Sequence, residues 1–399
     1  MKILVVSSRY PPHRSPESAH TLLLCEQLAA RGVEVDLLTS ELLPGFPAPH
    51  GFRLHPLMKS WGFRHFFNLV LFVRRLRPDA VLLIYIDWIY DCEPMVSFIP
   101  AVLKRLRPDM PFVTQFENES GLAGFQPPHD IKTRLSKWLL SWLVGRRGLH
   151  PTYGSLLRDS SRVIALSEHH LEAFERAHPT VTKKTEVIPA PPVMRFTAEA
   201  KSARKRGRAM LGLSDQDLVL AYFGYVYPMK GMETLLTAFG SLPPNMRLVI
   251  VGDGKVDYLQ KLNELSRSAG GAERIIWAGH CEDEIASIYL HAADICVLPF
   301  NDGVRLNNSS FAVAASHGLP IVTTLGDSLE SPFLDGENVR LCLPKNPVAL
   351  AAAITELAHS PDMRKRLAAG ARRLAESHFS WDRTIDATLR TFQMSSEVK

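Results

Sequence analysis

The sequence predicts an α/β protein with two doubly wound parallel sheets, one in each half of the chain. Short apolar runs of strand length alternate with segments of helical periodicity, a pattern typical of parallel strands joined by crossover helices. These runs are continuously apolar, as expected of strands buried on both faces. The alternation is interrupted near residue 190 by a proline-rich and basic segment, and it restarts with a new strand at Leu218. The sequence therefore favours two domains over one.

In the first half, a strand is predicted over 2–7, and a helix over 19–31 ends at Gly32. Residues 63–77 are basic and apolar and run directly into the strand at Asp79. We interpret them as a helix that packs on the sheet. The further strands predicted in this half cover 33–38, 79–84, 111–114 and 163–166.

Residues 187–207 have a different texture. Pro189, Pro191 and Pro192 cannot continue the interior of a sheet. Five basic residues follow them, and we interpret the segment as an interdomain linker. The strands predicted after it cover 218–223, 247–251, 274–278, 295–299 and 320–323. The helices predicted with them cover 232–239, 311–317, 361–376 and 381–392.

Composition narrows the class of protein. The 399 residues are 46% hydrophobic and 22% charged, which is typical of globular domains with full cores. The net charge of +5 is small, so nucleic acid is not an expected partner. Small anionic substrates or an anionic membrane surface suit this charge better.

The five cysteines are scattered, without CxxC or metal-ligand spacing. We expect reduced thiols in a cytoplasmic protein and no metal site. The apolar run at the amino end is too short for a secretory signal, and no run is long enough to cross a bilayer.

The segment 221–231 is the first candidate site. Gly224 lets the chain turn off a buried strand, and Lys230 and Gly231 precede a helix. A lysine at the carboxyl edge of a sheet, beside the amino end of a helix, is well placed to bind a diphosphate. The alternative is a solvated surface lysine.

Two later turns are weaker candidates. Gly252, Asp253 and Gly254 form a glycine-rich turn after a strand, which is either a ligand contact or a plain strand-to-helix turn. Residues 302–310 precede the helix over 311–317 and are rich in Asn and Ser. Free N–H groups at such a helix end attract phosphate oxygens, and the alternative is ordinary helix capping.

Carboxylates follow a strand in the first half as well. Glu117 and Glu119 are candidates to bind or activate an acceptor hydroxyl, and the alternative is ordinary loop charges. His20, near the start of the first helix, is interpreted as a histidine on the helix surface.

Residues 131–147 are basic, lack acidic side chains and place two tryptophans on one helical stripe. Such a helix can lie in a membrane interface. The alternative is a core-packing helix with a solvated basic face. The residues expected at the membrane are Lys137, Trp138, Trp142 and Arg146.

Motifs spread over nearly the whole chain, in this order and spacing, resemble those of the family 4 glycosyltransferases, whose architecture is the two-Rossmann GT-B fold. The matching segments are Tyr10-Pro11-Pro12, 31–35, 161–167, 186–189, 223–231, 248–254, 292–299, 318–323 and 379–381.

The sequence departs from the family pattern at five places. Arg305 and Val313 occupy the positions of two glutamates around the donor loop, and Tyr225 replaces an arginine. Phe116 stands where the family has a histidine, and Ser15-Pro16 lies near its absent glycine pair. Residues 302–310 instead resemble a subgroup with its own donor loop.

The resemblance implies a Rossmann-like acceptor-binding domain over 1–190 and a nucleotide-sugar-binding domain over 191–378, with a central cleft between them. It also implies a helix over 379–399 that returns to the first domain. Lys230, Arg305 and Glu117 are the expected catalytic residues. The expected donor-binding residues are Gly224, Tyr225, Lys230, Gly231, Gly252, Asp253, His280, Cys281, Glu282, Asn307, Asn308, Ser309 and Ser310. The expected acceptor-loop residues are Ser15, Pro16, His20, Glu117 and Asn118.

The resemblance implies a hexosyl transfer from a UDP- or GDP-sugar to a glycan or lipid-linked acceptor, retaining and independent of metal and cofactor. The implied location is cytoplasmic, peripheral on the inner face of the cell membrane, in polysaccharide biosynthesis. The losses at Arg305 and Val313 keep two alternatives open. One is a degenerate scaffolding subunit that binds the nucleotide sugar, and the other is a nucleotide-sugar epimerase.

Overall fold

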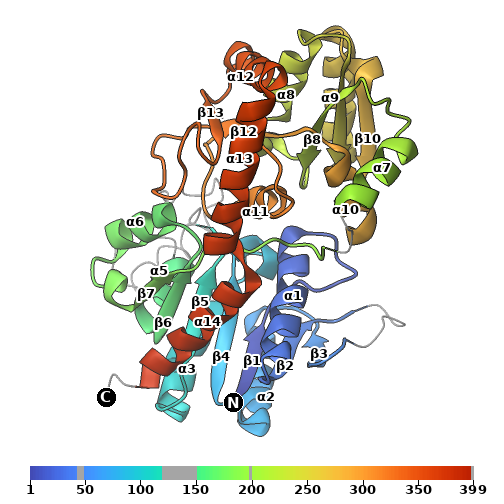
Figure 1. Ribbon diagram of the computed structural model, residues 1–399. Coiled ribbons are helices and arrows are strands. Elements are labelled where there is room, and N and C mark those ends of the chain that lie inside the picture. The colour runs from blue at the N-terminus through green and yellow to red at the C-terminus, as the bar shows by residue number, and fades with distance from the viewer. Residues whose placement is uncertain (43–48, 119–150, 197–199, 397–399) are drawn as a thin grey trace, which may run out of the picture. The chain divides into compact units, whose positions relative to one another are not determined.

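The computed structural model describes residues 1–42, 49–118, 151–196 and 200–396. Contacts between Cα atoms divide the chain into two compact units. Unit 1 comprises Met1–Pro189 and Trp381–Lys399, and unit 2 comprises Ala190–Ser380. Each unit is built on one parallel sheet, with seven strands in unit 1 and six in unit 2 (Figure 1). The predicted α/β class with two doubly wound, Rossmann-like sheets is confirmed.

The unit 1 sheet has the strand order β3-β2-β1-β4-β5-β6-β7, and every pair is parallel. The central strands are apolar, and all six residues of β4 are buried. The strands are β1 (Lys2–Val6), β2 (Glu34–Ser40), β3 (Arg53–Met58), β4 (Ala80–Tyr85), β5 (Phe112–Phe116), β6 (Arg162–Ala165) and β7 (Thr185–Val187). Because the order runs outward in both directions from β1 and β4, right-handed crossovers place helices on both faces.

The described α-helices of unit 1 are α1 (Pro16–Ala30), α2 (Phe66–Leu76), α3 (Ile99–Leu106), α5 (Pro151–Asp159), α6 (Glu168–Ala177) and α14 (Trp381–Ser396). Short helical turns lie at η1 (Phe63–His65), η2 (Asp87–Tyr90), η3 (Pro94–Phe98) and η5 (Val181–Lys184). α1 begins three residues before its predicted start because Ser15 caps it and Pro16 fits its first turn.

The C-terminal helix α14 packs within unit 1, beside α1 (Figure 1). Arg31 at the end of α1 forms ion pairs with Asp382 and Asp386. Trp381 stacks on the His20 ring, with 5.8 Å between the ring centroids. Arg162 donates a hydrogen bond to the Met394 carbonyl at 2.8 Å. These contacts attach the C-terminal helix to α1 and to β6.

The unit 2 sheet has the strand order β10-β9-β8-β11-β12-β13, again with parallel pairs throughout. Its strands are β8 (Leu218–Phe223), β9 (Met246–Val251), β10 (Ile275–Gly279), β11 (Ile295–Leu298), β12 (Ile321–Thr324) and β13 (Arg340–Cys342). Its α-helices are α7 (Ala200–Met210), α8 (Met232–Gly240), α9 (Val256–Ser268), α10 (Asp283–Ala292), α11 (Ser309–Ser316), α12 (Pro347–His359) and α13 (Pro361–Leu374). Short turns lie at η6 (Pro228–Lys230), η7 (Ala272–Arg274) and the π-helical η8 (Ala375–Phe379).

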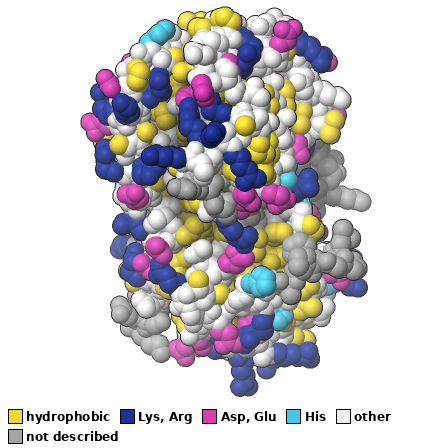
Figure 2. Space-filling view, turned by 45° about the vertical axis from the view of Figure 1, so that its right-hand side comes forward, with side chains coloured by type: hydrophobic (Ala, Val, Ile, Leu, Met, Phe, Trp, Pro, Cys, Tyr) yellow, Lys and Arg dark blue, Asp and Glu magenta, His cyan; other side chains and the backbone are white. Residues whose placement is uncertain are grey.

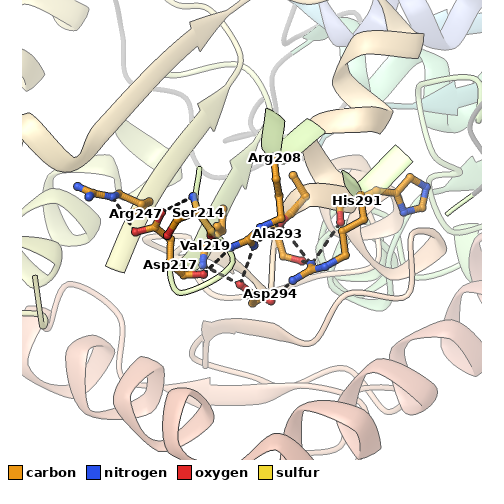
Figure 3. A network of polar contacts seen from close by, with 10 residues as sticks. Arg208, Ser214, Asp217, Val219, Arg247, His291, Ala293 and Asp294 are labelled. Carbon is orange, nitrogen blue, oxygen red and sulfur yellow. Dashed lines mark hydrogen bonds and ion pairs between the residues drawn. The ribbon is translucent and has the colours of Figure 1, made fainter. Parts of the chain in front are cut away.

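The interpretation of residues 187–207 as a linker is wrong for its basic part. Residues 200–210 form α7, which lies along α10 in unit 2. Arg204 and the buried Arg208 both bond to Asp294, with Arg204 Nη2 2.6 Å from its Oδ1. Asp294 Oδ2 also accepts a hydrogen bond from the backbone N–H of Val219 at 2.8 Å (Figure 3). Arg204 and Arg208 therefore attach the helix to the first strand of unit 2 through Asp294, whereas Lys201, Lys205 and Arg206 are exposed.

All five cysteines are free thiols, and Cys25 and Cys296 are buried in the cores. Across the described ranges, no helix has the length and apolar character needed to cross a membrane. The same ranges contain no group of three or more His, Cys, Asp or Glu side chains arranged to hold a metal ion.

Candidate functional site

The strand order of unit 2 creates a switch point at its first strand. β8 has β9 on one side and β11 on the other, so the chain leaves these neighbouring strands in opposite directions. The loops that follow β8 and β11 therefore part at the carboxyl edge of the sheet, where doubly wound proteins bind ligands. They contain residues 224–231 and 299–308, the two segments with the strongest sequence signals.

Glycines bring the loop after β8 against its neighbours. Gly224 has φ of +134°, and a Cβ there would lie 3.3 Å from the Cβ of Ser310. Gly252 has φ of +152°, and a Cβ there would lie 2.0 Å from the carbonyl oxygen of Gly224. A side chain at either position would separate backbone segments that now touch. The structure thus places Gly224 directly beside the amino end of α11.

The turn that carries Lys230 is fixed by the loop after β11. Gly231 has φ of +70°, and a Cβ there would lie 1.9 Å from the Pro299 carbonyl oxygen. Asn301 donates to two carbonyls of the turn, from its backbone N to Met229 at 3.0 Å and from Nδ2 to Pro228 at 2.7 Å. These contacts hold Lys230 at the meeting point of the two loops.

The Lys230 side chain is half-buried, and its ammonium lies over aromatic rings. Nζ is 4.7 Å from the centroid of Phe300 and 5.6 Å from that of Tyr227. It has no hydrogen bond or ion pair with any residue that the structure describes. Burial lowers the pKa of Lys230 from 10.5 to about 8. A bound anion would restore the lost solvation and favour the charged form.

The amino end of α11 is open as well. Asn308 occupies the N-cap position but makes no capping hydrogen bond, because its Oδ1 accepts the backbone N–H of Arg305 at 2.8 Å. Ser310 is 3% exposed, and its Oγ has no partner in the described part of the chain. The backbone N–H groups of Ser309 and Phe311 bond to the carbonyls of Asn307 and Asn308, so the site offers an anion the buried Ser310 hydroxyl and the positive end of the helix.

The other residues expected at the donor site differ in how far they are buried. Arg305 and Asn307 are half-buried on the loop before α11, and the backbone of Ser309 bonds to the Asn307 carbonyl. Tyr225 is partly exposed, and its ring lies 6.3 Å from that of Tyr227. Val313 is fully buried within α11, so it offers no surface to a ligand.

The expected nucleobase region lies on the loop after β10. His280 and Glu282 are exposed there. The thiol of Cys281 points to the Ala278 carbonyl at 3.6 Å, and burial raises its pKa. The Asp253 carboxylate accepts the backbone N–H of Gly254 at 2.8 Å, so it stabilises its own turn. A hydrogen bond from Gly252 N to Gly279 O (2.8 Å) joins these two loops.

In unit 1, the carboxyl edge holds a buried polar cluster. Gln115 Nε2 lies 2.8 Å from Glu117 Oε1 and 2.9 Å from His20 Nε2. The amide therefore donates one N–H to each partner, which leaves the neutral imidazole with its proton on Nδ1. Glu117 and His20 are 3.9 Å apart. Burial is the largest influence on both groups: it raises the pKa of Glu117 from 4.5 to about 7 and lowers that of His20 from 6.5 to about 4.

This cluster corrects the interpretation of His20 as a surface histidine. His20 is only 4% exposed, because Trp381 of α14 covers its ring. Helical periodicity alone cannot show that a second helix, from the far end of the chain, covers this face of α1.

Of the other site residues predicted in the first half of the chain, some lie in the described part of the structure and the rest lie outside it. Ser15 caps α1 by accepting the Ser18 N–H, and Pro16 lies in the first turn, so both serve the helix start. Asn118 Oδ1 accepts the Tyr153 hydroxyl at 2.8 Å. Glu119 and the expected membrane residues Lys137, Trp138, Trp142 and Arg146 lie outside the described residues.

Sequence reasoning missed several residues of these sites, among them Gln115, Phe300 and Asn301. Gln115 could have been found, because alternate residues of a strand share a face and Gln115 lies two positions before Glu117. Phe300 and Asn301 lie in the loop after β11, and that position was the available signal. The buried carboxylate of Glu330, which accepts the backbone N–H of Leu306, left no recognisable signal.

Two family models match the chain. The model described as "Glycosyltransferase Family 4" matches residues 18–191, and "Glycosyl transferases group 1" matches residues 204–374. The first match covers most of unit 1, and the second covers most of unit 2, including both switch-point loops.

Curated relatives agree with these models. A D-inositol 3-phosphate glycosyltransferase of Xylanimonas cellulosilytica is 27% identical over 252 residues, 60% of this chain and 58% of the relative. An uncharacterized glycosyltransferase of Methanocaldococcus jannaschii is 25% identical over 100% of this chain and 99% of its own. The chain spans about half the length of the D-inositol 3-phosphate glycosyltransferases it matches.

Solved structures share the fold. Sucrose-phosphate synthase from Thermosynechococcus elongatus has a TM-score of 0.74 at 18% identity, covering 99% of this chain and 98% of that one. The Anabaena protein HepE, solved with UDP and glucose, has a TM-score of 0.71 at 19% identity, covering 99% and 100%. With the two family models placed on its two units, the chain belongs to the group 1, family 4 type of glycosyltransferases and has the GT-B fold.

Proposed function

We propose that the protein transfers a hexosyl group from a UDP- or GDP-sugar to a glycan or lipid-linked acceptor in polysaccharide biosynthesis. The observation that carries this proposal is the open cation site of unit 2. Lys230 and the amino end of α11 present an ammonium and a buried Ser310 hydroxyl, neither with a partner in the described chain. A diphosphate supplies the negative charge and the acceptor oxygens that such a site lacks. HepE, of the same fold, is a protein solved with UDP.

The same groups are suited to the chemical step. When the bond between the sugar and the diphosphate breaks, negative charge develops on the leaving phosphate. Donors that are already fixed in place stabilise this charge without reorganising. Gly231 and Asn301 fix Lys230, and Gly224 leaves room beside Ser310. Arg305 adds a planar guanidinium on the donor loop, which suits phosphate oxygens, and we propose that its charge replaces the one lost at Tyr225.

Glu117 is proposed to bind the acceptor hydroxyl in unit 1. Its side chain is 14% exposed, and its carboxyl group receives a hydrogen bond from Gln115. With a pKa of about 7, Glu117 is shared between its two protonation states near neutral pH. It can therefore hold a hydroxyl as a donor or as an acceptor of a hydrogen bond. We propose that the transfer needs no metal ion and retains the anomeric configuration. NMR of the first-formed anomer would test the retention.

A thermal-shift panel of UDP-, GDP- and ADP-sugars tests the donor site. A ligand of the folded protein raises the melting temperature by mass action. We expect a UDP- or GDP-sugar to stabilise the wild type and Lys255→Ala, whose lysine is exposed near the neighbouring turn. The same sugar should leave Lys230→Ala unshifted. If no nucleotide sugar stabilises the wild type, or if Lys230→Ala responds fully, the donor site is misplaced.

A degenerate subunit remains the second candidate, favoured by one observation. The position of the family's second glutamate is Val313, which is fully buried and cannot bind a ligand. A subunit of this kind would bind the nucleotide sugar and transfer nothing to any acceptor. An epimerase would convert the donor with no acceptor present, so one assay with and without acceptor separates the three functions. The proposed place of action is cytoplasmic, at the inner face of the membrane.

A further inference from the structure

Helix α2 of unit 1 covers the sheet with one face only. Leu69, Val70 and Val73 are buried against the unit 1 core. The Phe72 ring meets His55 of the edge strand β3 edge-on, with 4.9 Å between centroids. The packing expected for residues 63–77 is therefore present, but it uses about half of the helix surface.

The opposite face is apolar and exposed. Phe67 is 74% exposed, Phe63 is 53% exposed and Leu71 is 45% exposed. At about 100° per residue, Phe67, Leu71 and Arg74 project within roughly 60° of one another. Leu57, at the bulge near the end of β3, is also 54% exposed. A folded protein normally buries such side chains, so a row of them is typical of a binding surface.

Arginines share this face. Arg64, Arg74, Arg75 and Arg77 are exposed, and Arg74, Arg75 and Arg77 form no ion pair with described residues. The sequence contains no Asp or Glu between Glu41 and Asp79. Figure 2 shows Lys and Arg side chains gathered at the lower end of the face that it draws. We call Phe63, Arg64, Phe67, Leu71, Arg74 and Arg75 the α2 surface.

The acidic side chains near this surface lie at its margins, and those on β2 are already paired, Asp36 with Arg53 and His55 and Glu34 with Arg53 and Lys2. A Cβ at Gly62 would lie 3.5 Å from a carboxylate oxygen of Glu93, which places Glu93 beside the start of the helix. Asp79, beyond its end, accepts the backbone N–H of Lys2 at 2.7 Å. The α2 surface itself is thus purely apolar and cationic.

We propose that the α2 surface binds an anionic lipid bilayer. Phe67 and Leu71 would enter the boundary between headgroups and acyl chains, and the arginines would contact anionic headgroups. An amphipathic helix with exposed aromatic and basic side chains has the composition of helices that lie in this boundary. Each arginine near an anionic surface strengthens binding by about fivefold. This inference deepens the proposed place of action and rests on that part of the proposed function, while vesicle binding can be measured separately from sugar transfer.

A second copy of the chain fits this surface less well. A twofold interface places the same patch of both copies together. Two α2 surfaces would then bring their arginines together with no carboxylate on either, and like charges in contact oppose association. A bilayer containing anionic lipid supplies the negative charge that a second copy lacks.

Vesicle co-sedimentation of the full chain tests the proposal. The probes are vesicles of phosphatidylcholine alone and of equal parts phosphatidylcholine and phosphatidylglycerol. We expect the wild type to bind the anionic vesicles, and binding to weaken as salt screens the charges. The double variant Phe67→Ser/Leu71→Ser should bind at least about tenfold more weakly because it loses its inserted apolar area. Arg74→Gln/Arg75→Gln should lose roughly thirtyfold and most of the salt dependence.

Matched controls lie in unit 2, where Val348 is 79% exposed and Arg267 is exposed. Val348→Ser and Arg267→Gln should bind vesicles like the wild type, and every variant should keep its melting temperature. The proposal fails if the wild type ignores anionic vesicles, or if only Trp138→Ser/Trp142→Ser loses binding. It also fails if Phe67→Ser/Leu71→Ser instead abolishes a concentration-dependent dimer measured by light scattering.

Discussion

The carboxyl edges of the two sheets differ in how their polar groups are satisfied. In unit 2, the Lys230 ammonium and the Ser310 hydroxyl have no polar partner in the described chain, and aromatic rings surround the cation. In unit 1, His20, Gln115 and Glu117 bond to one another within a buried cluster. An unpartnered cation is suited to an anionic ligand, whereas a hydrogen-bonded cluster whose carboxyl group can gain or lose a proton near neutral pH is suited to a hydroxyl group. The same topology thus supports two kinds of recognition.

Removing the Lys230 ammonium from the carboxyl edge of unit 2 should lower the transfer rate more than any other change. We expect Lys230→Ala to lower the transfer rate about 10²–10³-fold, the magnitude of losing one fixed donor to a developing anion. The measurement is steady-state transfer at saturating acceptor, with Lys255→Ala as the matched control. A variant that keeps wild-type turnover would remove Lys230 from the reaction.

Replacing Glu117, at the carboxyl edge of unit 1, by a neutral residue should have the second-largest effect on the transfer rate. We expect Glu117→Gln to lower transfer about 10²-fold while leaving donor affinity unchanged, because its carboxylate is proposed to act on the acceptor. Wild-type activity should rise as pH increases through about 7, where Glu117 ionises, and the variant should lack this rise. Equal pH profiles for the two proteins would argue against this role.

The raised pKa of Glu117 also has a consequence for stability. The folded protein holds this proton up to pH about 7, whereas the unfolded chain releases it near 4.5. The stability contributed by the neutral carboxyl is therefore present below pH 4.5 and lost as pH rises through 7. At pH 8, Glu117→Gln should be more stable than the wild type, by at most roughly 3 kcal/mol. Thermal melts from pH 5 to 8 should show this difference shrinking toward pH 5.

Arg305 should give the smallest effect. Its fork adds to a site where Lys230 and α11 already supply positive potential, so we expect Arg305→Ala to weaken donor binding about tenfold. Arg305→Lys should recover only part of this loss, because lysine cannot hold two oxygens in one plane. Calorimetric titration with the stabilising nucleotide sugar measures both. If Arg305→Ala kept the wild-type donor affinity and turnover, Arg305 would have no role in donor binding or in the reaction.

The sequence predicted the interior of both sheets and much less of their margins. Strands such as β4 and β8 are continuously apolar, so burial on both faces was readable. β3, β7 and β13 went unpredicted because edge strands are short or carry exposed polar residues. The basic helix α7 was misread because a charge pattern does not show that Asp294 and several carbonyl groups bind its arginines.

The site divides in the same way. The glycine and lysine pattern over 224–231 was local, and the structure places Gly224 beside Ser310 as a loop at the switch point requires. The pairing of Gln115 with His20 joins residues 95 positions apart, and no periodicity reports such a contact. The stacking of Trp381 on His20 is equally invisible in the sequence, because it depends on how α14 docks.

The most direct test of the open cation site is the pH dependence of UDP and GDP binding, measured by calorimetry. With a pKa of about 8, Lys230 is mostly charged at pH 7 and mostly neutral at pH 8.5. Because only the charged form attracts the diphosphate, the affinity of the wild type should fall about fourfold between these pH values. Lys230→Ala should bind weakly and show no such decline. Wild-type affinity that is independent of pH, or equal to that of Lys230→Ala, would contradict the assignment of this site to the donor.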